Sequence, residues 1–334
     1  MPFEIISYCC GEYPSYGGVA RYDAQLKLTF PHRYFYKGPE DKQRMLERLS
    51  TLENPIVITD NHLSCDIPND YPVLLVHHGC ARRTADVNPD WDPYWKNLCR
   101  DGQDQMLDYR KPENTWIISC STGCVVNFDK YYGDSYRQFT KEIILHSSEW
   151  DELSNHIRPS NDIPKVLGNW LSIHKGKHFM ENIRANIPEY VFEDLNLQPF
   201  SGEPLEAFNV RKHSIYASSD IFLQLSKTEG NSYAALDALP NGLVLLSTQC
   251  GLSEYDLPED CFVSLEYERC DDAMYIKEKL DFAMEYKNEL VNNAYEWYFQ
   301  HCRFPDWQKK MLDIVNRFYH HNYAQGEHIL LAIP

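Results

Sequence analysis

The sequence lacks any cysteine pair at metal-binding spacing, although it contains 11 cysteines among its 334 residues. No CxxC motif occurs, which excludes the usual zinc-finger and zinc-ribbon sites. The cysteine number is odd and the spacing irregular, so a disulfide framework is not indicated either. We therefore expect reduced, mostly buried thiols and a cytoplasmic protein.

Positive charge is also scarce. Lys and Arg number 32 against 49 Asp and Glu, which gives a formal net charge of -17. Such a chain repels nucleic acids and anionic membranes, so we expect neither as a main partner. A local basic pocket for one phosphorylated small molecule remains compatible with this charge.

Long apolar runs are missing as well. No stretch approaches eighteen uncharged apolar residues, so we expect no membrane-spanning segment. Residues 1–10 lack a basic start and a long apolar core, and we expect no signal peptide. The chain nevertheless has 43% hydrophobic and 13% aromatic residues, and 334 residues exceed what one core usually holds. Two well-packed domains are therefore expected.

Short apolar runs alternate with helical patterns in both halves of the chain, which predicts two parallel sheets of the α/β class. The predicted strands are Phe3–Cys10, Pro55–Asp60, Tyr71–Val76, Asn114–Thr122 (a strand with its turn), Glu142–Leu145, Lys165–Gly168, Tyr190–Phe192, Asp220–Leu225, Leu243–Leu246 and Asp260–Leu265. Lys277–Tyr298 is predicted as one long helix and Pro305–His320 as another.

The apolar pattern fades between the two halves, and this predicts the domain organisation. We expect a first domain at residues 1–150 and a linker at 151–164. A second domain is expected at residues 165–300, followed by a C-terminal helix and tail at 301–334.

Two carboxylates fall within one predicted strand–turn–helix unit of the second half. Glu229 lies in the polar turn after the strand Asp220–Leu225, and Asp237 lies in a helix that starts near Ser232, a favourable N-cap. Open α/β sheets bind ligands outside the carboxyl ends of their strands. Each carboxylate alone is more often an ordinary surface residue, but the pair favours a binding site.

The first half carries two further candidates. Gly17-Gly18 lies between a strand and a helix N-terminus, where backbone N–H groups can face a diphosphate, although such pairs as often form ordinary turns. His77-His78 follows a buried strand, so these histidines either face a ligand or are buried in the core.

Asp90-Trp91-Asp92 formally matches an Asp-x-Asp metal site. No apolar strand precedes it and prolines flank it on both sides. We interpret it as a loop and expect no metal site.

The segment Glu229-Gly-Asn-Ser-Tyr-Ala-Ala-Leu-Asp237 resembles the E-x-F-G-x-x-x-x-E signature of retaining, nucleotide-sugar-dependent glycosyltransferases. Five more features follow the same family's order: Gly17-Gly18, His78-Gly79, Gly168 with Lys175-Gly176, Tyr216–Ser226, and Gly251-Leu-Ser-Glu254. Across nearly the whole chain the sequence is similar to glycosyltransferase family 4. The resemblance implies the GT-B fold, in which two Rossmann-like domains face a central cleft and a C-terminal helix crosses back to the first domain.

The resemblance also implies that the first domain contacts the acceptor and the second the donor, and it implies roles for residues of the second half. Lys175 would hold the donor diphosphate, Glu229 would face the donor sugar, and Asp237 would bind the nucleotide ribose. Backbone amides near the phosphate would come from Gly230, Asn231 and Ser232, and Glu254 would be a minor donor contact. The nucleotide base would lie against the loop at Phe200–Pro204.

From the first half, Gly17 and Gly18 would pack against the diphosphate, and His78 would lie near the anomeric carbon. The implied activity is a hexosyltransferase reaction with retention, moving a sugar from a UDP- or GDP-linked donor to a hydroxyl acceptor. It would need no metal and no cofactor besides the donor substrate.

The sequence departs from the family pattern at several of these positions. Asn169 stands where the family has an arginine that assists the lysine, and Asp237 replaces a glutamate. Asn231 and Ser232 replace the aromatic residue and the glycine of the motif. Neighbouring cations could supply the missing charge: Arg82, Arg83, Lys165 or Lys177.

These departures are compatible with two alternative functions. One is a non-catalytic module that binds nucleotide sugars, and the other is a nucleotide-sugar epimerase on the same fold. The acceptor and the oligomeric state stay undetermined at this stage.

Overall fold

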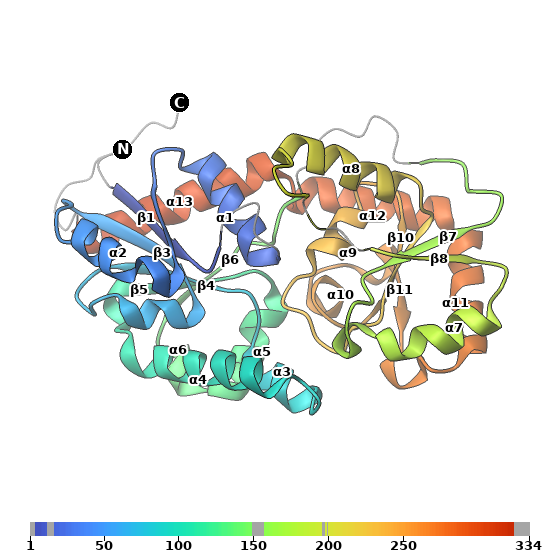
Figure 1. The fold of residues 1–334 in the computed structure, drawn as a ribbon, viewed down its shortest axis with the longest axis horizontal. Coiled ribbons are helices and arrows are strands. Elements are labelled where there is room, and N and C mark those ends of the chain that lie inside the picture. The colour runs from blue at the N-terminus through green and yellow to red at the C-terminus, as the bar shows by residue number, and fades with distance from the viewer. Residues whose placement is uncertain (1–3, 12–16, 149–156, 196–197, 199, 324–334) are drawn as a thin grey trace.

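The computed structural model describes residues 4–11, 17–148, 157–195, 198 and 200–323. They form two α/β domains side by side, each built on one parallel sheet (Figure 1). The predicted fold class of two Rossmann-like domains is confirmed. Of the predicted linker, residues 151–156 lie outside the described part, and residues 157–164 contain neither helix nor strand.

The first sheet has six strands in the order β2-β1-β3-β4-β5-β6. Their bounds are β1 Glu4–Cys9, β2 Tyr34–Lys37, β3 Pro55–Asp60, β4 Val73–His77, β5 Thr115–Ser119 and β6 Thr140–Ile143. The helices of this domain are α1 Gly18–Thr29, α2 Lys42–Leu49, α3 Ala81–Val87, α4 Pro93–Tyr109, α5 Thr122–Tyr132 and α6 Asp134–Arg137.

The second sheet has five strands in the order β11-β10-β9-β7-β8. Their bounds are β7 Lys165–Gly168, β8 Val191–Asp194, β9 Ile221–Gln224, β10 Val244–Thr248 and β11 Phe262–Leu265. The helices that follow are α7 Met180–Asn186, α8 Leu205–Ala217, α9 Tyr233–Ala238, α10 Leu252–Tyr255, α11 Ala273–Glu285, α12 Lys287–His301 and α13 Phe304–Tyr323.

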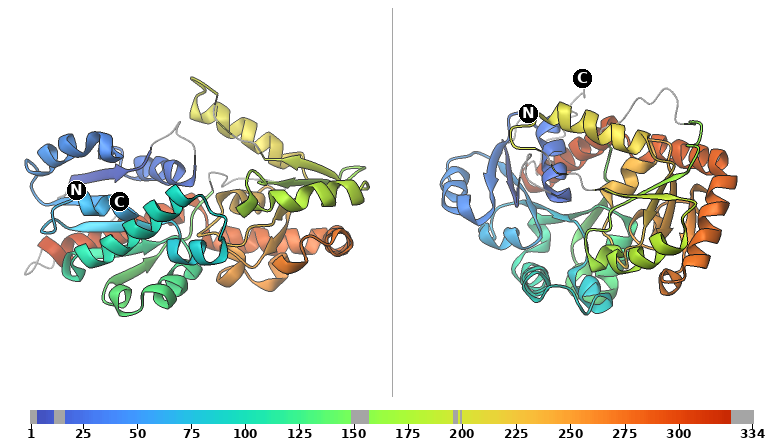
Figure 2. Two further views of the ribbon diagram at one scale, coloured as in Figure 1. Left: turned by 60° about the horizontal axis from the view of Figure 1, so that its bottom comes forward. Right: turned by 45° about the vertical axis from the view of Figure 1, so that its right-hand side comes forward.

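Helices cover both faces of each sheet, so every central strand is buried on both sides (Figure 2). The C-terminal helix α13 belongs to the core of the first domain. Its buried Trp307, Met311 and Phe318 share one apolar cluster with Ile5 and Ile56 of the first sheet. Burying side chains of this size stabilises the contact by roughly 1.5–3 kcal/mol each. As the resemblance implied, the last helix crosses back to the first domain.

The stretch Lys277–Tyr298 was predicted as one helix, and this prediction was wrong. The chain leaves helical geometry at Tyr286, which separates α11 from α12. The two helices pack differently: Leu280 of α11 belongs to one apolar cluster of the second sheet, whereas α12 contributes Leu290 to that cluster and Trp297 to the other.

No helix within the described ranges is long and apolar enough to cross a membrane.

Candidate functional site

The turn after β9 and the loop after β7 bring a lysine and a carboxylate together. Lys175, at the end of the short helix Ile173–Lys175, forms an ion pair with Glu229 in the turn. Ser226 lies two residues after β9, and its hydroxyl donates a hydrogen bond of 2.7 Å to the same Glu229 oxygen. Two residues that are 54 positions apart thus meet at the carboxyl edge of the second sheet.

A small polar cavity adjoins this ion pair. It is lined by Asn169, Lys175, Phe222, Gln224, Leu225, Ser226, Glu229 and Ser232. Its volume is about 10 Å³, which is close to the space that one water molecule needs. Ser232 begins α9 as predicted, because its hydroxyl accepts a hydrogen bond of 3.3 Å from the Ala235 amide.

Asp237 of α9 is turned toward the first domain. Its carboxylate accepts two hydrogen bonds of 2.7 Å from Arg21 and one of 2.8 Å from Ser148. Lys212 lies 3.6 Å away, and Asp237 is 2% exposed. Burial opposes its ionisation, but the charges of Arg21 and Lys212 outweigh burial and lower the pKa of this carboxyl. In this arrangement both Asp237 oxygens bind protein groups.

The predicted glycines lie where the two domains touch. A methyl group added at Gly230 would overlap the carbonyl oxygen of His78, so only glycine fits at this contact. A methyl group added at Gly18, the first residue of α1, would come within 3.2 Å of the Tyr233 ring. Both glycines therefore permit close approach between the domains, and Gly17 precedes α1 as an exposed residue.

Asn231 joins the same contact. Its side-chain amide donates 2.8 Å to the Cys120 carbonyl, which follows β5 of the first domain. The neighbouring Ser121 hydroxyl donates 2.6 Å to the Gly230 carbonyl. The turn that carries Glu229 is thus held against the carboxyl end of the first sheet.

His78 follows β4 and pairs with a carboxylate that the sequence analysis did not select. Its Nε2 lies 2.9 Å from Asp60 at the end of β3, and the backbone amide of Cys10 donates 3.1 Å to the other Asp60 oxygen. The Tyr22 ring meets His78 edge-on at 5.3 Å. The place of Asp60 at the carboxyl end of a predicted strand was the available signal for it.

The other histidine of the pair has a structural role. His77 is fully buried and stacks on Phe128 with ring centroids 4.0 Å apart. Burial lowers its pKa to about 3. Strand alternation explains the difference, because consecutive residues at the end of β4 point to opposite faces.

Glu254 of α10 bridges the domains and does not line the small cavity. Its carboxylate accepts a 2.6 Å hydrogen bond from Arg83 of α3. The other cations considered as substitutes for the missing arginine do not line the cavity either. Arg82 pairs with Asp104 and Lys165 with Glu193, while Lys177 is exposed.

Two remaining predictions concern loops. Phe200, in the loop proposed for the base, is 64% exposed, and the Arg211 guanidinium lies 4.1 Å from its ring centre. Asp92 of the Asp-x-Asp stretch caps α4 by accepting from the Tyr94 and Trp95 amides. Among the described residues no group of three His, Cys, Asp or Glu side chains could hold a metal ion.

No protein-family model matches the sequence, and no curated protein matches it. Several solved structures, by contrast, match the fold of this chain. Sucrose-phosphate synthase from Thermosynechococcus elongatus superposes with a TM-score of 0.70 at 13% identity, covering 95% of this chain and 99% of that one.

Two further structures are similar over the same extent. HepE from Anabaena in complex with UDP-glucose has a TM-score of 0.65 at 12% identity, covering 94% of this chain and 99% of that one. WaaG, a glycosyltransferase involved in lipopolysaccharide biosynthesis, has a TM-score of 0.62 at 12% identity, covering 93% and 99%. Structural similarity at such low sequence identity shows the fold alone, and this chain has the GT-B fold.

Proposed function

We propose that this protein is a retaining glycosyltransferase of the family 4 type, a hexosyltransferase. It would move a sugar from a nucleotide-diphosphate donor to the hydroxyl of a glycan or another acceptor. Neither a metal ion nor a cofactor besides the donor is part of this proposal. GT-B neighbours that are glycosyltransferases support the reaction class.

The observation that carries the proposal is the meeting of Lys175 and Glu229 at the carboxyl edge of the second sheet. When the acceptor oxygen bonds to the anomeric carbon, the bond to the diphosphate breaks and negative charge gathers on the leaving group. The Lys175 ammonium is placed to neutralise that charge, and preorganised charge of this kind is a large catalytic contribution. Glu229 can accept hydrogen bonds from sugar hydroxyls, as carboxylates do.

The donor needs more room than this arrangement offers. A cavity of about 10 Å³ holds about one water molecule and not a diphosphate. Donor binding therefore requires the Lys175–Glu229 pair to separate and the domains to move apart, followed by closure over the substrate. Asp237 can reach the ribose only after Arg21 has left it.

The first nucleotide to test is uridine diphosphate, because structures of the similar HepE contain UDP, UDP-glucose and glucose. GDP-linked donors are the second choice. The eleven free cysteines support a reducing compartment, and we propose the cytoplasm.

A non-catalytic module that binds nucleotide sugars is the second candidate. Two observations favour it: Asn169 in place of an arginine leaves one cation fewer for the diphosphate, and Arg21 occupies the Asp237 carboxylate that would bind the ribose. An epimerase on the same fold has no structural observation in its favour.

Measuring turnover of the donor distinguishes the transferase from the non-catalytic module. The experiment measures UDP release from UDP-glucose, with and without simple sugar acceptors, for the wild type, Glu229→Ala and the control Glu278→Ala on the exposed side of α11. A transferase releases UDP, loses at least about tenfold in rate with Glu229→Ala and keeps its rate with the control. Donor binding without any release, insensitive to Glu229→Ala, would instead identify the module.

A further inference from the structure

Two thiols lie in contact close to the surface where the domains meet. The Sγ atoms of Cys120, which follows β5, and Cys124, in the first turn of α5, are 3.5 Å apart. Both side chains are buried, and both thiols are free. A disulfide bond is about 2.05 Å long, so the two sulfurs need to approach by about 1.5 Å to form one. The pair is therefore placed for a cross-link within one short segment of the chain.

The surroundings of Cys124 favour its thiolate, which is the form of a thiol that reacts with oxidants. A hydrogen bond from the Cys120 thiol lowers the pKa of Cys124, and the Ser121 side chain adds to this effect, although burial opposes it. The N-terminus of α5 also favours negative charge at this position. Donating that hydrogen bond and burial both raise the pKa of Cys120. One sulfur of the pair is thus prepared to react first and the other to follow.

The segment that carries the first thiol also holds the turn after β9 against the first domain. The Cys120 carbonyl accepts a hydrogen bond of 2.8 Å from the Asn231 amide. The adjacent Ser121 hydroxyl donates 2.6 Å to the Gly230 carbonyl. A cross-link draws Cys120 toward Cys124 and shifts the backbone on which both hydrogen bonds depend. Oxidation of the pair therefore acts directly on a contact between the domains.

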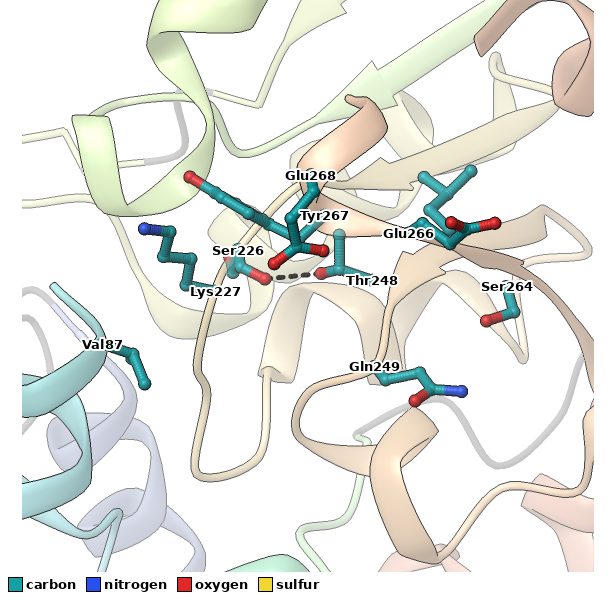
Figure 3. A pocket seen from close by; sticks show the side chains of 10 residues that line it. Val87, Ser226, Lys227, Thr248, Gln249, Ser264, Glu266, Tyr267 and Glu268 are labelled. Carbon is teal, nitrogen blue, oxygen red and sulfur yellow. Dashed lines mark hydrogen bonds between the residues drawn. The ribbon is translucent and has the colours of Figure 1, made fainter. Parts of the chain in front are cut away.

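The opposite flank of this turn borders open space. Ser226 and Lys227, at the start of the turn, line a hollow of about 500 Å³, and Val87 of α3 lines it from the first domain (Figure 3). The hydrogen bond drawn in Figure 3 joins Ser226 to Thr248 of the same domain. Because the hollow separates this flank from α3, weakening the bonds on the other flank lets the turn move away from the first domain.

We propose that Cys120 and Cys124 form a reversible disulfide when hydrogen peroxide oxidises them, and that this cross-link loosens the contact between the domains. The Cys124 thiolate attacks one peroxide oxygen, which gives a sulfenic acid and a hydroxide, and the hydroxide takes up the proton that Cys124 released. The Cys120 sulfur then displaces hydroxide from the sulfenic sulfur, and this hydroxide leaves as water with the Cys120 proton. Two thiols and one peroxide thus give one disulfide and two water molecules.

Peptide mapping of the full-length protein tests the cross-link. Trypsin cleaves after Arg110 and Lys130 but not before Pro112, and the peptide between these sites contains no cysteines besides the pair. After peroxide treatment and blocking of free thiols, this peptide is expected to have lost two hydrogens, and dithiothreitol should restore both thiols. The cross-link should form at least about tenfold faster than the single buried thiols of Cys250 and Cys302 are oxidised.

X-ray scattering on the same samples measures the loosening. Oxidation should shift the equilibrium between closed and open domains about tenfold toward the open state, because two hydrogen bonds are weakened. The radius of gyration should therefore rise, and it should return to its first value after reduction. Cys120→Ala and Cys124→Ala should not respond to peroxide, whereas the control Cys261→Ala, at a buried position of the second domain, should respond like the wild type. The reduced and oxidised wild type form a comparison that needs no substitution.

The inference is overturned if the peptide keeps both thiols, or if Cys124 ends as a sulfinic acid without a cross-link. It is also overturned if the cross-link forms while the radius of gyration stays unchanged. UDP release should fall about tenfold on oxidation, and this one consequence rests on the proposed function. A protein that releases no UDP in either state loses the transferase function, while mapping and scattering still decide whether the cross-link forms and loosens the domains.

Discussion

At the scale of single residues, the charged groups of the cleft are held by partners of opposite charge. Lys175 binds Glu229, Arg21 binds Asp237 and Arg83 binds Glu254. Partly buried pairs of this kind stabilise little on balance, because desolvation offsets their attraction. These pairs hold the charged side chains in position, and a charged ligand can replace one partner of a pair.

At this scale, residues could be predicted where a local sequence motif marks them, and not where only a long-range contact does. Lys175 and Glu229 were selected because each lies in a local motif at a strand end. Arg21 was not selected, because its partner Asp237 is 216 residues away and no local pattern marks the pair. Asp60 was missed for a similar reason, since its contact with His78 forms only when two strands become neighbours.

Lys175→Met is expected to weaken UDP binding by about tenfold to a hundredfold, because a charge-assisted contact to the diphosphate is lost. Lys177→Met, two residues along and exposed, is the matched control and should bind UDP like the wild type. Titration calorimetry measures both. Equal affinities of the two variants would remove Lys175 from the donor site.

Asp60→Asn is expected to lower the turnover number by about tenfold or more while UDP affinity stays unchanged, because Asp60 positions His78 and does not reach the donor. The double variant with His78→Asn should lose no more than His78→Asn alone, since both changes remove one interaction. The turnover number is also measured as a function of pH. If Asp60 had a purely structural role, the losses in turnover caused by Asp60→Asn and His78→Asn would add, and the pH dependence of turnover would stay unchanged.

At the scale of elements, the buried central strands were predictable, whereas the edge strand β2 and the break between α11 and α12 were not. The central strands β3, β4, β9 and β10 carry continuous apolar runs, because both faces of a parallel sheet are covered. The edge strand β2 was missed, since Tyr34–Lys37 is only partly buried and has no such run. The break between α11 and α12 at Tyr286 was missed because no proline or glycine marks it in the sequence.

The turn after β9 offers a prediction at this scale. Gly230→Ala places a methyl group into the His78 carbonyl, so the domains cannot close as they do here. We expect a folded protein with an unchanged circular dichroism spectrum, a larger radius of gyration by X-ray scattering, and little transferase activity.

Gly79→Ala is the control for this variant, because a methyl group there would meet Gly230 at an ordinary 3.7 Å. It should keep the dimensions of the wild type. If Gly230→Ala has the same radius of gyration as Gly79→Ala, the proposed contact does not limit closure.

At the scale of the whole molecule, two separately packed domains meet mainly through polar contacts, and α13 returns the chain to the core of the first domain. Hydrogen bonds from Ser121, Thr122 and Asn231 cross between the domains, and Leu145 of the first domain packs against one apolar cluster of the second. The other large clusters lie within one domain each, with α13 counted in the first. Polar contacts break and reform more readily than an apolar core. The fold class was therefore predictable from strand alternation, but the closed arrangement was not.

Acid should destabilise the first domain through His77. Its pKa is about 3 in the folded protein and 6.5 as an unperturbed side chain, so below pH 6.5 the unfolded chain binds the extra proton. The contribution of neutral His77 to the free energy of unfolding is thus complete above pH 6.5. Between pH 6.5 and pH 3 this contribution falls by about 1.4 kcal/mol per pH unit.

Urea unfolding at pH 7.5, 6.0 and 5.0 measures this loss. His77→Leu removes the titrating ring and should flatten the decline between pH 6.0 and 5.0 by about 1 kcal/mol, even if it lowers stability at pH 7.5. His178→Leu, which replaces an exposed histidine, should keep the slope of the wild type. Identical slopes for wild type and His77→Leu would mean that His77 is not neutral in the folded state.

The central claim is that the second domain binds a nucleotide sugar at the Lys175–Glu229 pair. Thermal melting with UDP, GDP, ADP and their sugars, compared for wild type and Lys175→Met, tests it most directly. The account predicts a rise of several degrees with one nucleotide, most readily UDP, and a much smaller rise for the variant. A wild type whose melting temperature stays unchanged with every nucleotide would contradict it.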